Sequence, residues 1–171
     1  MPEIDHFLYI HDSVAFCIAT GRFVLPTVQF LAHRMRRQVV PDKNLFFSGP
    51  GDYEFKARIY AQEHDLRVLV DFTDPTLNEE AADVGGPVLK EYWRRVSQAY
   101  SEVTIGKTYV LLPGDPKTLG ATWYKGTIWD TIEWPILQQN SAVTQILRIN
   151  PTMSPAQGIN IKPAWTVPPS L

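Results

Sequence analysis

The sequence predicts an α/β fold in which N-terminal helices pack on a four-stranded parallel sheet whose strands are joined by crossover helices. Four short apolar runs, each as long as a single strand, alternate with longer amphipathic stretches typical of helices. Alternation of this kind favours right-handed β-α-β units, and therefore a parallel sheet. The expected strands are residues 44–48, 67–72, 107–112 and 143–149.

Length and composition fit one domain. The chain has 171 residues, and 44% of them are hydrophobic, which is enough to bury a sizeable core. We divide the expected domain, residues 1–171, into a helical part over 1–41, a parallel α/β part over 42–150 and a tail over 151–171. The prolines of the tail favour an extended segment without regular structure.

The helical part rests on residues 14–38, which are mostly apolar at helical spacing. Pro26 has no amide hydrogen, so we expect two helices or one helix kinked there. Cys17, in the same apolar stretch, is expected to be a buried thiol. A basic cluster closes the segment and consists of His33, Arg34, Arg36 and Arg37. This cluster is interpreted as a solvated helix end favoured by the helix dipole, with anion binding as the alternative.

Loops at one edge of the sheet are the expected place for a ligand. Helices are expected over residues 52–64, 88–103 and 130–138, between or after the strands. Two connections, residues 71–86 and 113–129, are longer than a simple link requires, which indicates function or flexibility. In parallel sheets ligands bind at the carboxyl ends of the strands, where both long loops begin.

Composition excludes several classes of partner. A net charge of −2 and a pI near 6.1 provide no basic field for nucleic acid or an anionic membrane. The start of the chain lacks a secretion signal, and no apolar run reaches membrane-spanning length, so a soluble, cytoplasmic protein is expected. One cysteine and four scattered histidines offer no disulfide and no metal-ligand spacing. Oligomeric state is left open.

The turn Ser48-Gly-Pro-Gly51 lies between an expected strand and an expected helix. Backbone amides at the start of a helix can receive phosphate oxygens. The turn lacks the Lys-Ser/Thr ending of a P-loop and the spacing of the dinucleotide-binding fingerprint. A plain tight turn is therefore the alternative interpretation.

Trp93 and Ser97 lie one turn apart in the expected helix over residues 88–103, so they share a face of that helix. The apolar residues of this helix recur at three- and four-residue spacing. Trp93 is therefore either a core residue or part of a site.

A carboxylate and several aromatic residues gather before Pro135. The aromatic residues are Trp123, Tyr124, Trp129 and Trp134. Indole faces near a carboxylate can form a box for a flat, cationic ring. Glu133, between Ile132 and Trp134, is either an exposed helix residue or a desolvated functional group. Asp130 is interpreted as a helix cap.

Three motifs within residues 45–149 resemble the ADP-ribosyl cyclase and NAD glycohydrolase family, and they occur in the same order along the chain as in the family. The helix Tyr92-Trp-Arg-Arg-Val-Ser-Gln-Ala-Tyr-Ser-Glu102 is similar to the family's helix with a tryptophan and a downstream serine. The segment Thr127-Ile-Trp-Asp-Thr-Ile-Glu133 resembles its catalytic segment, and Phe47-Ser48 resembles its tryptophan-serine pair with phenylalanine substituted. Two features differ: disulfides are absent, and the family's acidic segment has only a loose counterpart in Asp71-Phe-Thr-Asp74.

The resemblance implies that NAD is the substrate, that no cofactor or metal is needed, and that Glu133 is the catalytic carboxylate. It implies that Phe47 and Trp93 hold the cationic nicotinamide. Asp71 or Asp74 is the expected acid beside nicotinamide. Phosphates are expected to contact Ser48, Gly49, Ser97, Thr127 and Trp129. Use of NADP, and the balance between hydrolysis and cyclisation, are left open.

Two alternatives stay open. One is a non-catalytic nucleotide-binding or interaction domain with the same fold, and the other is a toxin-type effector that depletes NAD. The catalytic interpretation predicts that separate segments converge on one pocket at the carboxyl edge of the sheet. The converging residues are expected to be Ser48, Trp93, Ser97, Trp129 and Glu133.

Overall fold

The computed structural model describes residues 23–163. The expected helix over residues 14–22, and Cys17 within it, lie outside the described residues. In the described part, α2 (Val28–Arg36) begins two residues after Pro26, with the Thr27 hydroxyl accepting a hydrogen bond from the Phe30 amide at 3.0 Å. Residues 23–27 are not helical, so the expectation of a helical segment over residues 14–38, broken or kinked only at Pro26, was wrong in part.

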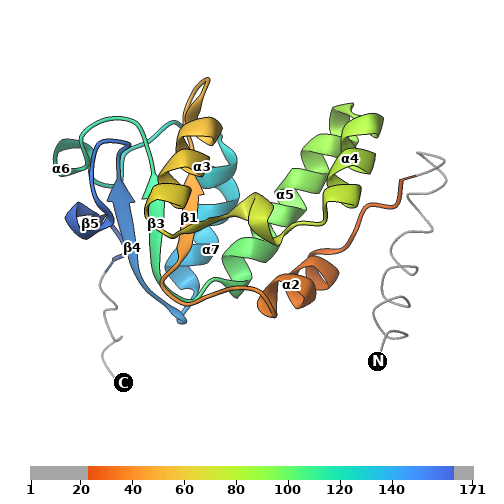
Figure 1. Ribbon diagram of the computed structural model, residues 1–171, viewed down its shortest axis with the longest axis horizontal. Helices are drawn as coiled ribbons and strands as arrows, with labels where there is room; N and C mark the ends of the chain where they lie inside the picture. The colour runs from red at the N-terminus through yellow and green to blue at the C-terminus, as the bar shows by residue number, and fades with distance from the viewer. Residues whose placement is uncertain (1–22, 164–171) are drawn as a thin grey trace, which may run out of the picture.

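A mostly parallel sheet forms the centre of the fold (Figure 1). Its strands are β1 (Asn44–Phe47), β2 (Arg67–Val68), β3 (Gly106–Leu111), β4 (Val143–Ile149) and β5 (Ile159–Asn160), in the spatial order β2-β1-β3-β4-β5. The first four strands are parallel, and β5 runs antiparallel to β4. The expected α/β fold with a parallel sheet is confirmed, and the described sheet has five strands where four were expected.

Two expectations about the strands were wrong in part. The strand expected over residues 67–72 ends at Val68, and the chain then forms a 3-10 turn, η1 (Leu69–Phe72), in which the Asp71 carboxylate accepts a hydrogen bond from the Val68 amide at 2.8 Å. The tail contains a second 3-10 turn, η3 (Pro155–Gln157), and the strand β5 instead of an irregular segment.

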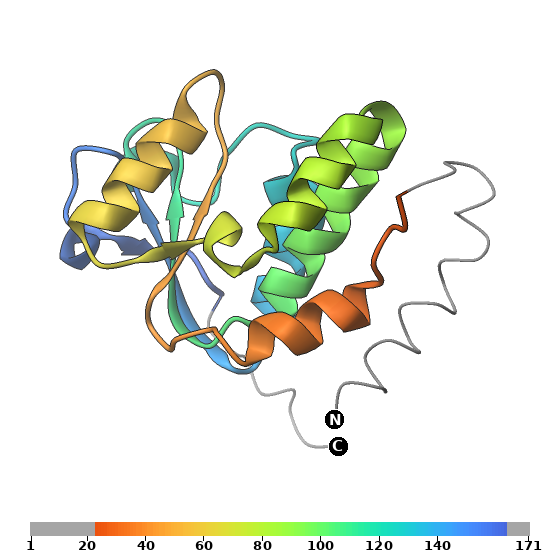
Figure 2. The same cartoon turned by 45° about the vertical axis from the view of Figure 1, so that its right-hand side comes forward.

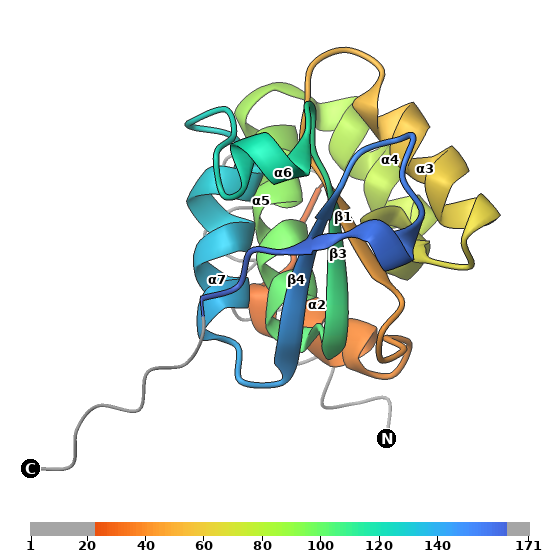
Figure 3. The ribbon, with the colours of Figure 1, turned by 90° about the vertical axis from the view of Figure 1, so that its left-hand side faces the viewer.

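Helices cover both faces of the sheet (Figures 2 and 3). The helix α3 (Tyr53–Glu63) lies on one face, and the other face is covered by α5 (Gly86–Val103) and α7 (Trp134–Gln139), with α2 packed on α5. Alternate residues of β1 serve the two sides, since Leu45 belongs to the core under α3 and Phe46 to the core under α5. Strand alternation therefore places Leu45 and Phe46 on opposite faces, and the packing of the helices puts Phe46 with the α5 residues.

The connection expected as a loop over residues 71–86 contains a helix, α4 (Pro75–Val84). The Asp74 carboxylate accepts a hydrogen bond from the Thr76 amide at 2.9 Å, and Pro75 occupies the first helical turn, where its missing amide is no loss. The loop after β3 likewise contains a short helix, α6 (Pro116–Leu119). None of the described helices is long and apolar enough to cross a membrane.

Candidate functional site

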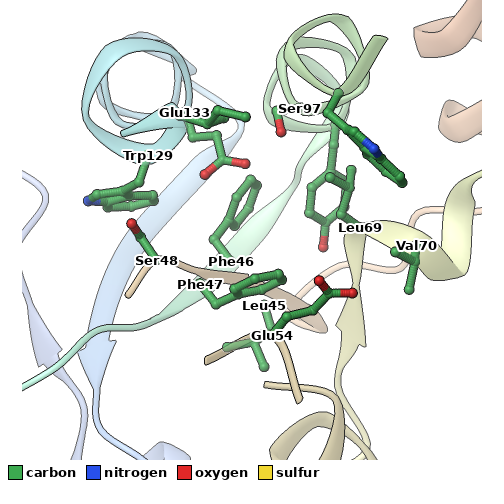
Figure 4. A pocket seen from close by; sticks show the side chains of 13 residues that line it. Leu45, Phe46, Phe47, Ser48, Glu54, Leu69, Val70, Ser97, Trp129 and Glu133 are labelled. Carbon is green, nitrogen blue, oxygen red and sulfur yellow. The ribbon is translucent and has the colours of Figure 1, made fainter. Parts of the chain in front are cut away.

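A pocket of about 280 Å³ opens beyond the carboxyl end of β1 (Figure 4). Its walls come from the end of β1, the start of α3, η1, α5 and the turn η2 (Trp129–Glu133). The residues lining it are Leu45, Phe46, Phe47, Ser48, Glu54, Leu69, Val70, Trp93, Ser97, Tyr100, Ile128, Trp129 and Glu133. All five residues expected to converge are among them, so the predicted convergence is confirmed, and Phe47 lines the same pocket.

Local structure explains why these side chains meet. Trp93 and Ser97 are four residues apart on α5 and therefore face the same way. Trp129 and Glu133 are four residues apart in η2, a π-helical turn in which the Trp134 amide donates to the Trp129 carbonyl five residues back. Single π-helical turns within helices are frequent at functional sites. The wider turn lets a large indole and a carboxylate project to the same side, as Figure 4 shows.

Glu133 is a buried acid with an unusual titration. Its exposed fraction is 6%, and burial raises its pKa from 4.5 to about 8, against a smaller opposing effect of a hydrogen bond with Ser97. No residue that lines the pocket is a lysine, an arginine or a histidine, so the described lining offers the carboxylate no cation. The free site therefore holds Glu133 largely protonated at neutral pH, and a cationic ligand would favour its ionised form.

Aromatic rings line the deep part of the pocket around Glu133. Phe46 stacks on Tyr100 with ring centroids 4.5 Å apart and tilts against Trp129 at 6.2 Å. The Tyr100 hydroxyl donates to the Arg67 carbonyl at 3.1 Å, and burial raises the pKa of this phenol well above its usual range. The Trp129 indole nitrogen lies on the side away from the Glu133 carboxylate (Figure 4). The pocket thus offers Glu133 carbon surfaces that exclude water.

Two acids expected beside the substrate have other contacts. Asp71 does not line the pocket, and its carboxylate binds the Val68 amide. Asp74 does not line it either, because its carboxylate caps α4 and forms an ion pair with Arg34 at 3.2 Å. Contact of either acid with a substrate stays a prediction.

Gly49 and Thr127 also lie outside the lining. A Cβ atom at Gly49 would come within 2.5 Å of the Tyr53 ring, so this turn requires glycine for a close approach. The Thr127 hydroxyl accepts a hydrogen bond from the Asp130 amide at 3.2 Å, so Thr127 caps the helical segment that begins at Ile128 and continues into η2. The interpretation of Asp130 as that cap was wrong.

The expected aromatic box is only partly assembled. Trp129 lines the pocket, whereas Trp123 and Trp134 pack against Trp129 outside the lining. Tyr124 is 60% exposed and takes no part in the lining. Sequence proximity to Glu133 was thus a poor guide to which rings reach the pocket.

Sequence reasoning missed Glu54, the second carboxylate of the pocket. It lies in the first turn of α3, across the pocket from Glu133 in Figure 4, and forms an ion pair with Arg58 at 2.6 Å. Its side chain is 57% exposed, so Glu54 belongs to the mouth and Glu133 to the interior. The available signal was an acid in the first turn of the helix expected after the first strand. No cluster of three potential metal ligands occurs among residues 23–163.

Replacing Glu133 with glutamine is expected to stabilise the protein increasingly as pH rises. Between pH 4.5 and about 8 the folded protein holds a proton on Glu133 that the unfolded chain has lost, so the parent loses stability over this interval. Glutamine stays neutral and avoids this loss. The difference in free energy of unfolding should be small at pH 4.5 and reach a few kcal/mol at pH 8, measured by chemical denaturation. Equal differences at both pH values would show that the carboxyl titrates normally.

Comparison with known proteins gives one informative result. No family model matches the chain, and no curated protein matches its sequence. Among solved structures, the chain is similar to the cyclase from Aplysia, which was crystallised with its substrate NGD and product cGDPR, with a TM-score of 0.50 and 19% identity. The match covers 71% of this chain and 53% of the cyclase, so this chain spans about half of that protein's length. The mixed α/β fold is therefore similar to that of an ADP-ribosyl cyclase.

Proposed function

We propose that this protein cleaves the bond between nicotinamide and ribose in NAD, with Glu133 as the catalytic carboxylate. The observation that carries the proposal is a buried carboxylate that faces an aromatic pocket with no basic residue in its lining. Such a pocket favours a flat cation over an anion. The motifs that resemble the NAD glycohydrolase family support NAD as the source of that cation.

The size and charge of the pocket suggest how NAD enters. A volume of about 280 Å³ is near the lower end for small-molecule sites and leaves room for nicotinamide and its ribose but not for a whole dinucleotide. Nicotinamide is cationic while attached, and the Trp93 and Phe47 rings offer it stacking and cation–π attraction. The diphosphate then lies toward the mouth, where the Ser48 hydroxyl is the available donor, because the Ser48 amide already donates to the Leu111 carbonyl at 3.1 Å.

The chemistry needs one carboxylate and one nucleophile. When the bond from C1′ of the ribose to nitrogen breaks, the electron pair leaves with nicotinamide, which becomes neutral, and the ribose gains oxocarbenium character. The ionised Glu133 carboxylate stabilises that positive charge. Attack of water on C1′, with loss of a proton, gives ADP-ribose, and attack of adenine N1 or N7 gives a cyclic product. Binding of the cationic substrate lowers the cost of ionising Glu133 in its buried position.

Replacing Trp93 with alanine is expected to weaken binding of NAD by about one to a few kcal/mol, because a stacking surface is lost. Binding is best measured by calorimetry in a Glu133→Gln background, where turnover does not consume the ligand. Trp93→Phe keeps an aromatic face and should recover most of the affinity. Unchanged affinity in Trp93→Ala would remove Trp93 from the binding site while leaving Glu133 untouched.

Release of nicotinamide tests the proposal. A folded, active preparation should convert NAD to nicotinamide and an ADP-ribosyl product without added metal or a second nucleotide. A preparation that binds NAD and leaves it intact would favour the non-catalytic alternative.

A further inference from the structure

Three indoles form a tryptophan cluster beside the pocket, made of Trp123, Trp129 and Trp134. Trp123 packs edge-on against Trp129 with centroids 5.6 Å apart and against Trp134 at 4.8 Å. Trp129 contributes to the pocket lining, whereas Trp123 does not. Trp123 therefore supports a wall of the pocket from outside.

The carboxylate of Asp130 holds Trp123 in this position. Its Oδ1 accepts hydrogen bonds from the Trp123 indole nitrogen at 2.8 Å and from the Lys125 ammonium at 3.0 Å, and its Oδ2 accepts from the Gly126 amide at 2.9 Å. These hydrogen bonds hold the pKa of Asp130 below its usual value. Asp130 lies inside η2, between Trp129 and Glu133 in the chain. One ionised side chain thus ties the preceding loop to the turn that carries the catalytic carboxylate.

We propose that Asp130 is a positioning residue of this site, which locks the Trp123 indole against Trp129 and thereby keeps the wall around Glu133 closed to water. The proposal rests on the function proposed above. Two geometric facts carry it: the same turn bears Asp130 and Glu133, and the same indole bonded by Asp130 packs on Trp129.

An amide cannot replace the carboxylate here. Asp130 presents two acceptor oxygens to three donors, one of which is an ammonium group. Asparagine has one acceptor oxygen, so its NH₂ group would face either the Gly126 amide or the Trp123 indole N–H, both of which are donors. The variant Asp130→Asn therefore releases part of the lock with almost no change in volume.

The test compares three variants with the parent. Asp130→Asn removes the charge and one of the two acceptor oxygens, and Trp123→Phe removes the indole N–H with its five-membered ring while keeping a six-membered aromatic ring. Asp115→Asn is the matched control, because Asp115 caps α6 in the same long connection through the Lys117 amide and the Thr118 hydroxyl and does not line the pocket. Turnover, KM and the pH at which activity reaches half its plateau are measured for each.

Asp130→Asn and Trp123→Phe should each lower turnover by roughly tenfold to a hundredfold and change KM less. The reason is that displacing a catalytic group slows the reaction more than it weakens substrate binding. Water admitted beside Glu133 should move the midpoint of the pH–rate profile down from about 8, toward 4.5. The double variant should be no slower than the slower single variant, because both changes break one contact. The control should keep the turnover and midpoint of the parent.

If Asp130→Asn and Trp123→Phe lose thermal stability but keep the turnover and pH midpoint of the parent, the hydrogen bond between Asp130 and Trp123 has only a structural role. That result would overturn the proposal. If Asp130→Asn does not fold, Trp123→Phe carries the same test. If the parent releases no nicotinamide, the proposed function fails separately. The titration of Glu133 can still be followed through the pH dependence of unfolding, relative to Glu133→Gln, with and without the Trp123 substitution. If the Trp123 substitution leaves the titration of Glu133 unchanged, the proposed role of Asp130 and Trp123 is overturned independently of the proposed function.

Discussion

Replacement of Glu133 by glutamine is expected to lower turnover of NAD by a factor of about a hundred to a thousand, the usual cost of deleting one electrostatic group that stabilises a transition state. Shape and burial stay nearly the same, so the folded state should survive and gain stability above pH 4.5. Binding of NAD should be retained, since the diphosphate and the stacked ring supply most of the ground-state contacts. Rates of nicotinamide release and an independent binding constant separate these two effects.

The parent enzyme should also respond to pH in a way that Glu133→Gln does not. The proposed reaction needs the ionised carboxylate, and burial raises its pKa to about 8. The value of kcat/KM for the free enzyme should therefore rise with pH and level off above that value. Activity that is flat from pH 4.5 to 8, in an enzyme that Glu133→Gln inactivates, would mean that the carboxyl is already ionised in the free site.

Replacement of Arg148 by methionine is expected to cost at least about 3 kcal/mol of stability, because it removes three hydrogen bonds from a charged donor, which contribute about 1.5–3 kcal/mol each. The side chain is 1% exposed, and its guanidinium donates to the carbonyl groups of Pro113, Gly120 and Thr122 at 2.6 to 2.7 Å. Without it, three carbonyl groups lose their charged donor. The guanidinium thus fastens the connection that leads to Trp123 onto β4.

Chemical denaturation provides the measurement for Arg148→Met. Lys43→Met is the control, because Lys43 pairs with Asp65 at 2.6 Å on the surface, where such pairs contribute at most about 1 kcal/mol. Arg148→Lys should lie between the two, since an ammonium keeps the charge but lacks the planar fork that reaches three carbonyls. Equal losses in Arg148→Met and the surface control would show that the connection does not depend on the guanidinium.

Much of the sheet could be predicted because its central strands are short, mostly apolar segments between longer amphipathic ones. Strands β1, β3 and β4 lie where the runs over residues 44–48, 107–112 and 143–149 place them. The run over residues 67–72 looked the same, but Asp71 within it bonds the Val68 amide and ends the strand. The signal was a carboxylate that can accept a hydrogen bond from a nearby backbone amide, and this local bond competed successfully with the ladder.

Helix α4 was not predicted from the sequence because of the residues that flank it. Pro75 and Gly85 were interpreted as marks of a loop, whereas they begin and end a helix. The pair Asp74-Pro75 is a typical helix start, so this error could have been avoided. Strand β5 could not have been found in this way, because its place depends on contacts with β4, such as the Ile161 amide donating to the Ile146 carbonyl at 2.8 Å.

The residues of the candidate site that belong to sequence motifs could be predicted. Spacing within a helix placed Trp93 with Ser97, and the order of three motifs brought these together with Ser48 and Glu133. The second carboxylate, Glu54, was missed because its place depends on the angle at which α3 leaves the sheet. The sequence also could not predict that Trp129 lines the pocket whereas Trp123 packs behind it, because the place of Trp123 depends on its hydrogen bond to Asp130.

Product analysis after incubation with NAD shows whether the protein releases nicotinamide and whether Glu133 is required. Nicotinamide, ADP-ribose and cyclic ADP-ribose are separated by chromatography and quantified for the parent and for Glu133→Gln. The parent should form nicotinamide in an amount equal to the sum of the two ADP-ribosyl products, and Glu133→Gln should form all three at least about a hundredfold more slowly. Intact NAD after prolonged incubation with folded parent protein, or equal rates for the two proteins, would contradict it.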